Sequence, residues 1–146
     1  MSDPFITNRL PQTVDLDIEK ETQKDHLVLV AEDFADSAIP ISLHLQQNGY
    51  RVVTASDGEE AVKAASISRP DVILMDIAMP ILDGLGAARK IRADSSLPYI
   101  PIIAITAFNT GGFLQAAYDV GFDGYLTKPI DFDRMVNLIK SLLADR

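Results

Sequence analysis

Residues 72–76 read VILMD, four apolar residues that end in a single aspartate. A short run of this kind is typical of a parallel strand that is covered on both faces. Two more runs have this form: LVLVA at 27–31, which Glu32 and Asp33 follow, and IIAIT at 102–106, which ends in Thr106. Polar residues therefore stand at the carboxyl ends of three predicted strands.

The segments between these runs alternate between strand and helix patterns. Two more strands are predicted, over 51–54 and 124–126, and a helix is predicted after each strand, with the first helix ending before Gly49. Five strands alternating with five helices indicate an α/β fold with a parallel sheet and right-handed crossovers. Ligands of such sheets bind beyond the carboxyl ends of the strands, so the polar residues there are expected to converge.

Capping residues and one proline set the expected helix boundaries. Asp57 with Glu60 three residues later is the capping-box pattern of a helix start. Pro40 is expected in the first turn of its helix, where a missing N–H is tolerated. The last helix, capped by Asp131, is expected to bury one apolar face, formed by Met135, Leu138, Ile139 and Leu142.

Composition narrows the class of protein. The chain has 146 residues, 47% of them hydrophobic, which supports a single domain with a real core. Its net charge of −8 disfavours nucleic-acid or anionic-membrane partners. It contains no cysteine, so a disulfide framework and a thiolate metal site are excluded. The start lacks a signal-peptide pattern, and no apolar run approaches the ~20 residues of a membrane span. We expect a cytoplasmic protein.

Residues 1–26 differ from residues 27–146, the predicted folded domain. They contain six acidic and three basic residues and two prolines. This composition favours a solvated, partly disordered extension. The alternative is that the extension packs on the domain or helps to form a dimer. Val14, Leu16 and Ile18 alternate with acidic residues and could pair as an edge strand.

The residues at the strand ends suggest phosphoryl chemistry. Clustered carboxylates of Glu32, Asp33 and Asp76 would repel one another unless a cation neutralised them. Oxygen ligands without nearby His or Cys favour Mg²⁺, or Mn²⁺, over zinc. The Asp76 carboxylate can attack phosphorus to form an acyl phosphate, with the Thr106 hydroxyl as a donor and Lys128 as a mobile positive charge. A cis Lys128–Pro129 bond would aim this lysine into the cleft, whereas a trans bond would simply lead into the last helix.

Four motifs at these spacings resemble the receiver domain of two-component response regulators, over residues 26–145: VAED, VILMD followed by IAMPILDG, IIAIT followed by Ala107, and GYLTKP. The resemblance implies a doubly wound, flavodoxin-like (βα)5 sheet with strand order 2-1-3-4-5.

The resemblance also implies roles for individual residues. Asp76 becomes the phospho-acceptor, while Thr106 and Lys128 contact the phosphoryl group. Asp33 ligates Mg²⁺ directly, Glu32 ligates it through water, and the backbone carbonyl of Ala78 completes the protein ligands. Tyr125 matches the switch aromatic, which turns inward when Thr106 moves toward the phosphoryl group.

The resemblance further implies a stand-alone receiver that is not an enzyme beyond its own phosphorylation and dephosphorylation. A histidine kinase or phosphotransfer protein would phosphorylate it. The face of the fourth helix, fifth strand and last helix would carry the signal to an unknown downstream protein or to a second copy in a homodimer. Two departures matter: Glu32 stands where relatives often have Asp, and Phe108 where many have a polar residue. Because Phe108 and Ala78 cannot position water, we expect slow self-dephosphorylation.

Three alternatives share parts of this pattern. The chain could be a receiver module of a hybrid kinase or multidomain regulator, with an identical site. A flavodoxin-like cofactor binder would need a Ser-, Thr- or Gly-rich phosphate loop after the first strand, where this chain has EDFAD at 32–36. A phosphatase that acts through an aspartyl phosphate typically has a second acid at the position of Ala78.

Overall fold

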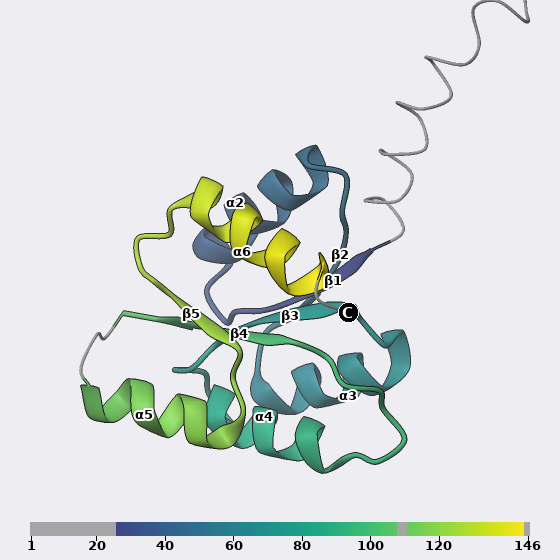
Figure 1. Cartoon of the computed structure of the whole chain (residues 1–146), viewed down its shortest axis with the longest axis vertical. Helices are drawn as coiled ribbons and strands as arrows, with labels where there is room; N and C mark the ends of the chain where they lie inside the picture. Colours follow the sequence, from purple (N-terminus) through teal and green to yellow (C-terminus); the bar gives the residue numbers. More distant parts are fainter. Residues whose placement is uncertain (1–25, 108–110, 145–146) are drawn as a thin grey trace, which may run out of the picture.

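The computed structural model describes residues 26–107 and 111–144, which form one five-stranded parallel sheet in the order β2-β1-β3-β4-β5 (Figure 1). The strands are β1 (Leu27–Ala31), β2 (Arg51–Ala55), β3 (Val72–Asp76), β4 (Ile102–Thr106) and β5 (Gly124–Thr127). The helices are α2 (Ala35–Gln47), α3 (Gly58–Ser68), α4 (Gly84–Ala93), α5 (Gly111–Val120) and α6 (Phe132–Ala144). The predicted α/β class and strand order are confirmed. The expectations for the extension and for Phe108 lie outside the described residues.

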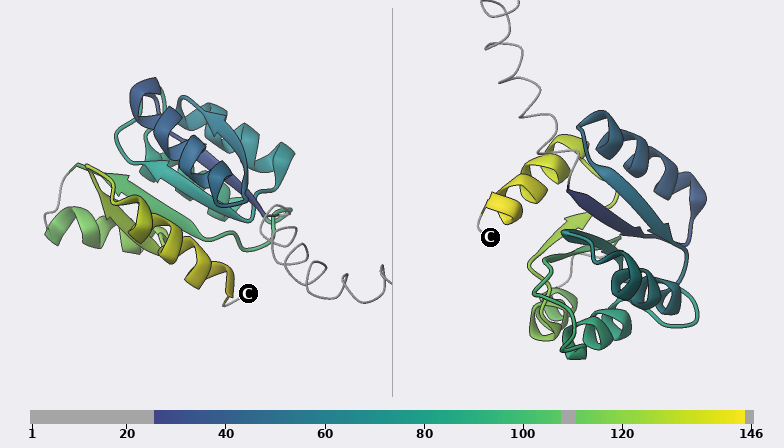
Figure 2. Two further views of the ribbon diagram at one scale, coloured as in Figure 1. Left: turned by 90° about the horizontal axis from the view of Figure 1, so that it is seen from above. Right: turned by 90° about the vertical axis from the view of Figure 1, so that its right-hand side faces the viewer.

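Helices cover both faces of the sheet, with α2 and α6 on one side and α3, α4 and α5 on the other (Figures 1 and 2). Successive side chains of a strand point to opposite faces, so a wholly apolar strand supplies both layers. In β3, for example, Leu74 packs with Ile41 of α2 and Met135 of α6, whereas Ile73 packs in the cluster that contains Ala88 of α4. All five residues of β3 and of β4 are buried.

The strand register aligns the carboxyl ends along one edge of the sheet. Ala31 lies opposite Met75, Asp76 opposite Ile105, and Thr106 opposite Thr127. The residues that follow β1 and β5 therefore lie beside Asp76 and Thr106. This alignment builds the functional site.

Two of the expected helix boundaries are confirmed and one is wrong. The Asp57 side chain accepts a hydrogen bond from the Glu60 amide at 2.7 Å, and Asp131 accepts one from the Arg134 amide at 3.1 Å. Pro40 lies inside α2, beyond its first turn. The helix tolerates it because the carbonyl left without its N–H partner belongs to Asp36, on an exposed part of the helix where water can replace that partner.

The start of α4 lies directly against the end of β3. A Cβ atom at Gly84 would lie 2.4 Å from the backbone oxygen of Asp76, so only glycine allows this approach. The preceding loop includes Ile81, which has a φ of 70° and is exposed. A β-branched residue in the left-handed region is strained.

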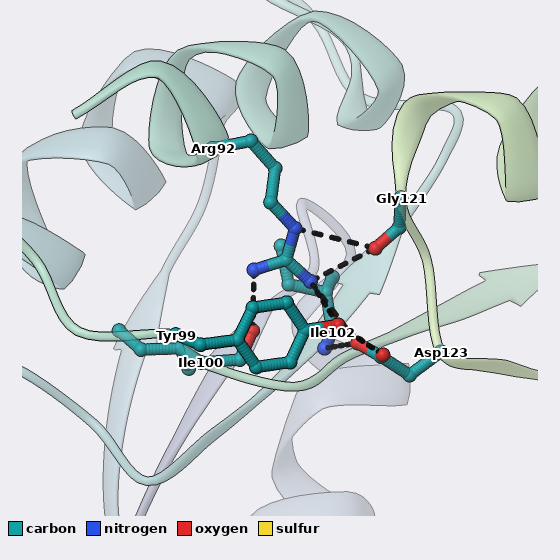
Figure 3. Close-up of polar contacts among 6 residues, drawn as sticks. All are labelled: Arg92, Tyr99, Ile100, Ile102, Gly121 and Asp123. Atoms are coloured by element: carbon teal, nitrogen blue, oxygen red, sulfur yellow. Dashed lines mark hydrogen bonds and ion pairs between the residues drawn. The ribbon is translucent and has the colours of Figure 1, made fainter. Parts of the chain in front are cut away.

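The opposite end of the sheet is held by the guanidinium group of Arg92, on α4 (Figure 3). It donates to the Ile100 carbonyl at 2.6 Å and to the Gly121 carbonyl at 2.8 Å, and it pairs with Asp123 at 3.0 Å. Asp123 also accepts hydrogen bonds from the Ile102 amide and the Tyr99 hydroxyl. This network, called the Arg92 clamp below, joins the end of α4 to the starts of β4 and β5.

Among the described residues, no helix is long and apolar enough to span a membrane.

Candidate functional site

Three carboxylates meet at the carboxyl ends of β1 and β3. One oxygen atom each from Glu32, Asp33 and Asp76 lies within 4.8 Å of the others. Glu32 and Asp76 are buried, with 3% and 4% exposure, whereas Asp33 is exposed. The carboxylates line a cavity of about 270 Å³, called the acidic cleft below, which Ala78, Thr106 and Lys128 also line.

Lys128 enters the acidic cleft from the loop after β5. Its Nζ lies 2.9 Å from Glu32 Oε1 and 3.0 Å from Asp76 Oδ2. The Lys128–Pro129 peptide bond is cis, the alternative that the sequence left open. One ammonium group thus faces two buried carboxylates, and the cluster keeps an excess of negative charge.

Ionisation in the acidic cleft is strongly perturbed. Burial, a hydrogen bond with Asp76 and the negative charge of Asp76 raise the pKa of Glu32 to about 7, although Lys128 opposes the shift. Partial burial opposes the charged form of Lys128, but its hydrogen bonds to Glu32 and Asp76 outweigh that effect and raise the pKa of Lys128. The lysine is therefore protonated at neutral pH.

The two oxygen atoms of Asp76 have different partners. Oδ1 accepts a hydrogen bond from the Ala78 amide at 3.0 Å, and Oδ2 accepts one from Lys128 at 3.0 Å. Thr106 is buried, with 2% exposure, and its backbone oxygen accepts a bond from the Lys128 amide. The predicted site residues on four different loops and strand ends are thus brought together.

Tyr125 lies outside the acidic cleft. It is half-buried on the edge strand β5, against the apolar cluster beneath α4 and α5. The guanidinium carbon of Arg134, on α6, lies 5.9 Å from the centre of the Tyr125 ring, within the range of a cation–π contact. This arrangement leaves the role of Tyr125 as a prediction.

Phe34 also lines the acidic cleft, although the sequence did not single it out. Its side chain is 56% exposed at the mouth of the cleft. The signal was its place directly after Glu32 and Asp33, because the first residues after a strand remain at the same edge of the sheet. An exposed aromatic at this position is available to any molecule that covers the cleft.

The donor set fits a hard divalent cation. Buried carboxylate oxygens carry net negative charge, and Glu32 Oε1 is paired with Lys128 Nζ at 2.9 Å. Oxygen donors are the ligands that Mg²⁺ prefers. A phosphate cofactor without a cation would be repelled here, which disfavours the flavodoxin-like cofactor alternative.

The comparisons with known proteins agree with this geometry. Residues 28–140 match the model of the response regulator receiver domain. The chain is 38% identical over 101 residues to the polar-differentiation response regulator DivK of Brucella anthropi, covering 69% of this chain and 82% of DivK. It is also 38% identical over 128 residues to the probable transcriptional regulator ycf27 of Guillardia theta.

Solved receiver structures have the same fold. The chemotaxis protein CheY4 of Vibrio cholerae superimposes with a TM-score of 0.76 at 31% identity, covering 80% of this chain and 98% of CheY4. The receiver domain of sensor histidine kinase PA1611 from Pseudomonas aeruginosa, solved with a magnesium ion coordinated in its active-site cleft, gives a TM-score of 0.76 at 34% identity, covering 82% and 98%. The match to ycf27 covers 88% of this chain but only 48% of ycf27, so the chain spans about half the length of that relative.

Proposed function

Because the chain belongs to the response regulator receiver domain family, we propose that it is a phosphoryl-accepting switch of a two-component or phosphorelay system, with Asp76 as the acceptor. The observation that carries the proposal is the placement of Asp76 Oδ2. This oxygen lies in a cavity of about 270 Å³, 3.0 Å from Lys128 Nζ and beside two further carboxylates.

The residues of the acidic cleft suit each part of the transfer. An oxygen of Asp76 forms the new bond to phosphorus, the bond between phosphorus and the donor breaks, and the product is an acyl phosphate. The Ala78 amide and Lys128 orient the Asp76 carboxylate before transfer. After transfer, Lys128 and the Thr106 hydroxyl would bind the phosphoryl oxygens, which carry negative charge; both residues line the acidic cleft.

Glu32, Asp33, Asp76 and the Ala78 carbonyl would hold Mg²⁺, and Mn²⁺ would fit the same oxygen donors. When bound, the cation neutralises charge that builds up on the phosphoryl oxygens. The buried carboxylates of Glu32 and Asp76 favour its binding, since Lys128 is the one cationic side chain that pairs with them within residues 26–107 and 111–144.

The partner proposed as donor is a histidine kinase or phosphotransfer protein, and the output is contact with another protein through α5, β5 and α6. Phosphorylation would shift an equilibrium between inactive and active conformations, with Tyr125 and Thr106 as the switch residues. The same site would serve a stand-alone cytoplasmic receiver or a module of a larger regulator.

The test is intact-mass spectrometry after incubation with a small phosphodonor and Mg²⁺. We expect the wild-type chain to gain one phosphoryl mass and the Asp76→Asn variant to gain none. Chelation of the cation with EDTA should abolish the gain. A gain in Asp76→Asn equal to that of the wild type would overturn the assignment of the acceptor.

A further inference from the structure

The outer edge of β2 is an open strand edge of the described fold. β2 is the last strand on its side of the sheet, and no strand of the described residues pairs with its outer edge. Arg51 and Ala55 bond toward β1, through the Arg51 amide and the Ala55 carbonyl. Since backbone groups of successive residues point in opposite directions, the amides and carbonyls of Val52 and Thr54 face outward. An open edge of this kind can accept another extended chain as a further strand.

A groove of about 470 Å³, called the β2 groove below, lies along this edge between β2 and α2. Its α2 wall is aliphatic and includes Ala38, Ile39 and Leu43, and its β2 wall includes Thr54. Ile39 is 57% exposed and Leu43 is 53% exposed. Helical residues that are four positions apart are neighbours on the helix surface. Ile39 and Leu43 therefore offer one apolar strip to any molecule that occupies the groove.

The remaining lining residues make the β2 groove acidic. Glu32, Asp33 and Glu60 line it, and no basic residue of the described chain does so. Glu32 is paired with Lys128, whereas Asp33 and Glu60 are exposed. Charges on an occupant must complement these carboxylates, because like charges across an interface are unfavourable. The groove therefore favours an occupant that combines aliphatic side chains with lysine or arginine.

The aliphatic and the acidic lining come from helices on opposite faces of the sheet. Ile39 and Leu43 belong to α2, which covers one face, and Glu60 belongs to the first turn of α3, which covers the other (Figures 1 and 2). Successive side chains of an extended strand point to opposite faces. A strand along the outer edge of β2 would therefore direct alternate side chains toward the aliphatic wall and toward the side of Glu60.

We propose that the β2 groove binds an extended segment of another protein in which aliphatic residues alternate with lysine or arginine. The segment pairs with the outward backbone groups of Val52 and Thr54. Its aliphatic side chains cover Ile39 and Leu43, and its basic side chains face Glu60. This surface is distinct from the one proposed for output through α5, β5 and α6, because β2 and β5 are the two opposite edges of the sheet.

Charge disfavours a second copy of this chain as the occupant. Two β2 grooves that faced each other would bring their exposed carboxylates together, and each chain carries a net charge of −8. A basic segment gains from the same carboxylates. The proposal therefore assigns the groove to a partner of opposite charge.

Labelled synthetic peptides and the full chain test this proposal by fluorescence anisotropy. The peptide KIKLKIK has the proposed alternation, and the control KKILIKK has the same composition with its aliphatic residues adjacent. We expect KIKLKIK to bind roughly tenfold more tightly than the control, because only alternation separates the aliphatic and basic side chains onto the two faces of a strand. Equal affinities would overturn the proposal, because they would indicate attraction by net charge alone. Absence of binding by either peptide would also overturn it.

A pair of protein variants localises the binding. Leu43→Lys places a positive charge in the aliphatic wall and should weaken the binding of KIKLKIK roughly tenfold. The matched control is Ile67→Lys, which makes the same change on α3 at a residue that is 82% exposed and does not line the groove. We expect its affinity to stay within about twofold of the wild type. Equal losses in the two variants would overturn the proposal, and melting curves check that both variants fold.

Amide hydrogen exchange tests the strand pairing itself. Saturating KIKLKIK should slow exchange at the outward amides of Val52 and Thr54. The Arg51 amide already donates to the His26 carbonyl of the neighbouring chain segment, so its exchange should stay unchanged and serves as the internal reference. Binding that leaves exchange at Val52 and Thr54 unchanged would overturn the proposal, because it would indicate an occupant that packs on α2 without pairing with β2.

Discussion

At the scale of single residues, the acidic cleft disfavours the charged form of Glu32. Its carboxyl is buried, lies beside Asp76, and has a pKa of about 7 instead of 4.5. The folded protein therefore holds a proton on Glu32 that the unfolded chain loses at lower pH. Without a cation, the contribution of Glu32 to the free energy of unfolding is fully present below pH 4.5 and is lost as the pH rises through 7.

The first prediction concerns this pH dependence. Between pH 5 and 8, in EDTA, the free energy of unfolding should fall by an amount on the order of 1–3 kcal/mol, given about 1.4 kcal/mol per pKa unit. Urea denaturation at each pH measures it. The Glu32→Gln variant should show a flatter profile, and saturating Mg²⁺ should restore stability at pH 8. A wild-type profile that rises over this range would contradict the assignment.

The second prediction concerns repulsion between the two buried carboxylates. Asp76→Asn removes a negative charge that faces Glu32, and the amide keeps nearly the same shape. We expect the free energy of unfolding at pH 8 in EDTA to rise by about 1 kcal/mol, as is found where a functional site is built at the expense of stability. The control is Asp83→Asn, which changes a carboxylate outside the cleft. Thermal melts of the wild-type protein, Asp76→Asn and Asp83→Asn measure the change in stability. A lower stability of Asp76→Asn than of the wild type would contradict the prediction.

Much of the site could be predicted at this scale, because strand-end positions determine which residues meet. Glu32, Asp33, Asp76, Thr106 and Lys128 all follow or close apolar runs, and parallel strands place their carboxyl ends together. A position at a strand end does not determine whether a side chain is buried. The raised pKa of Glu32 and the position of Phe34 at the mouth of the cleft could therefore not be predicted from the sequence. Pro40 was placed wrongly because hydropathy does not locate the first residue of a helix.

At the scale of elements, the Arg92 clamp joins α4 to β4 and β5. Arg92 was not predictable from sequence, because its partners Ile100, Gly121 and Asp123 are up to 31 positions away and no local pattern marks them. Gly121 has a φ of 109°, and a Cβ there would lie 3.2 Å from Arg92 Nε. The end of α5 is therefore shaped to receive this side chain.

The third prediction is that Arg92→Ala destabilises the protein by about 2–3 kcal/mol, because it leaves two carbonyls and the Asp123 carboxylate without a charged donor. The matched control is Arg89→Ala, an exposed arginine of the same helix, for which we expect a change below about 0.5 kcal/mol. Urea denaturation measures both variants. Equal effects would show that the clamp contributes nothing beyond ordinary surface contacts.

At the scale of the whole molecule, the acidic cleft adjoins the β2 groove of about 470 Å³ that lies between β2 and α2. Glu32 and Asp33 line both.

The sheet order and helix layers were predictable from the alternation of strand and helix patterns, since parallel sheets with right-handed crossovers leave few topologies. The groove was not predictable, because the exposure of Ile39 and Leu43 depends on how α2 rotates over β2. Helical spacing alone places Ala38, Ile41 and Leu45 together. It does not show that a second apolar flank of the helix remains uncovered.

The central claim is that Asp76 becomes an acyl phosphate, and chemical localisation tests it most directly. Borohydride reduces an acyl phosphate to an alcohol, so treatment after phosphorylation with Mg²⁺ should convert residue 76 to homoserine, and peptide mass spectrometry locates the change. We expect the modification at position 76 alone, and only in protein that was phosphorylated. Modification at Glu32 or Asp33, or none in protein that has gained a phosphoryl mass, would contradict the assignment of Asp76 as the acceptor.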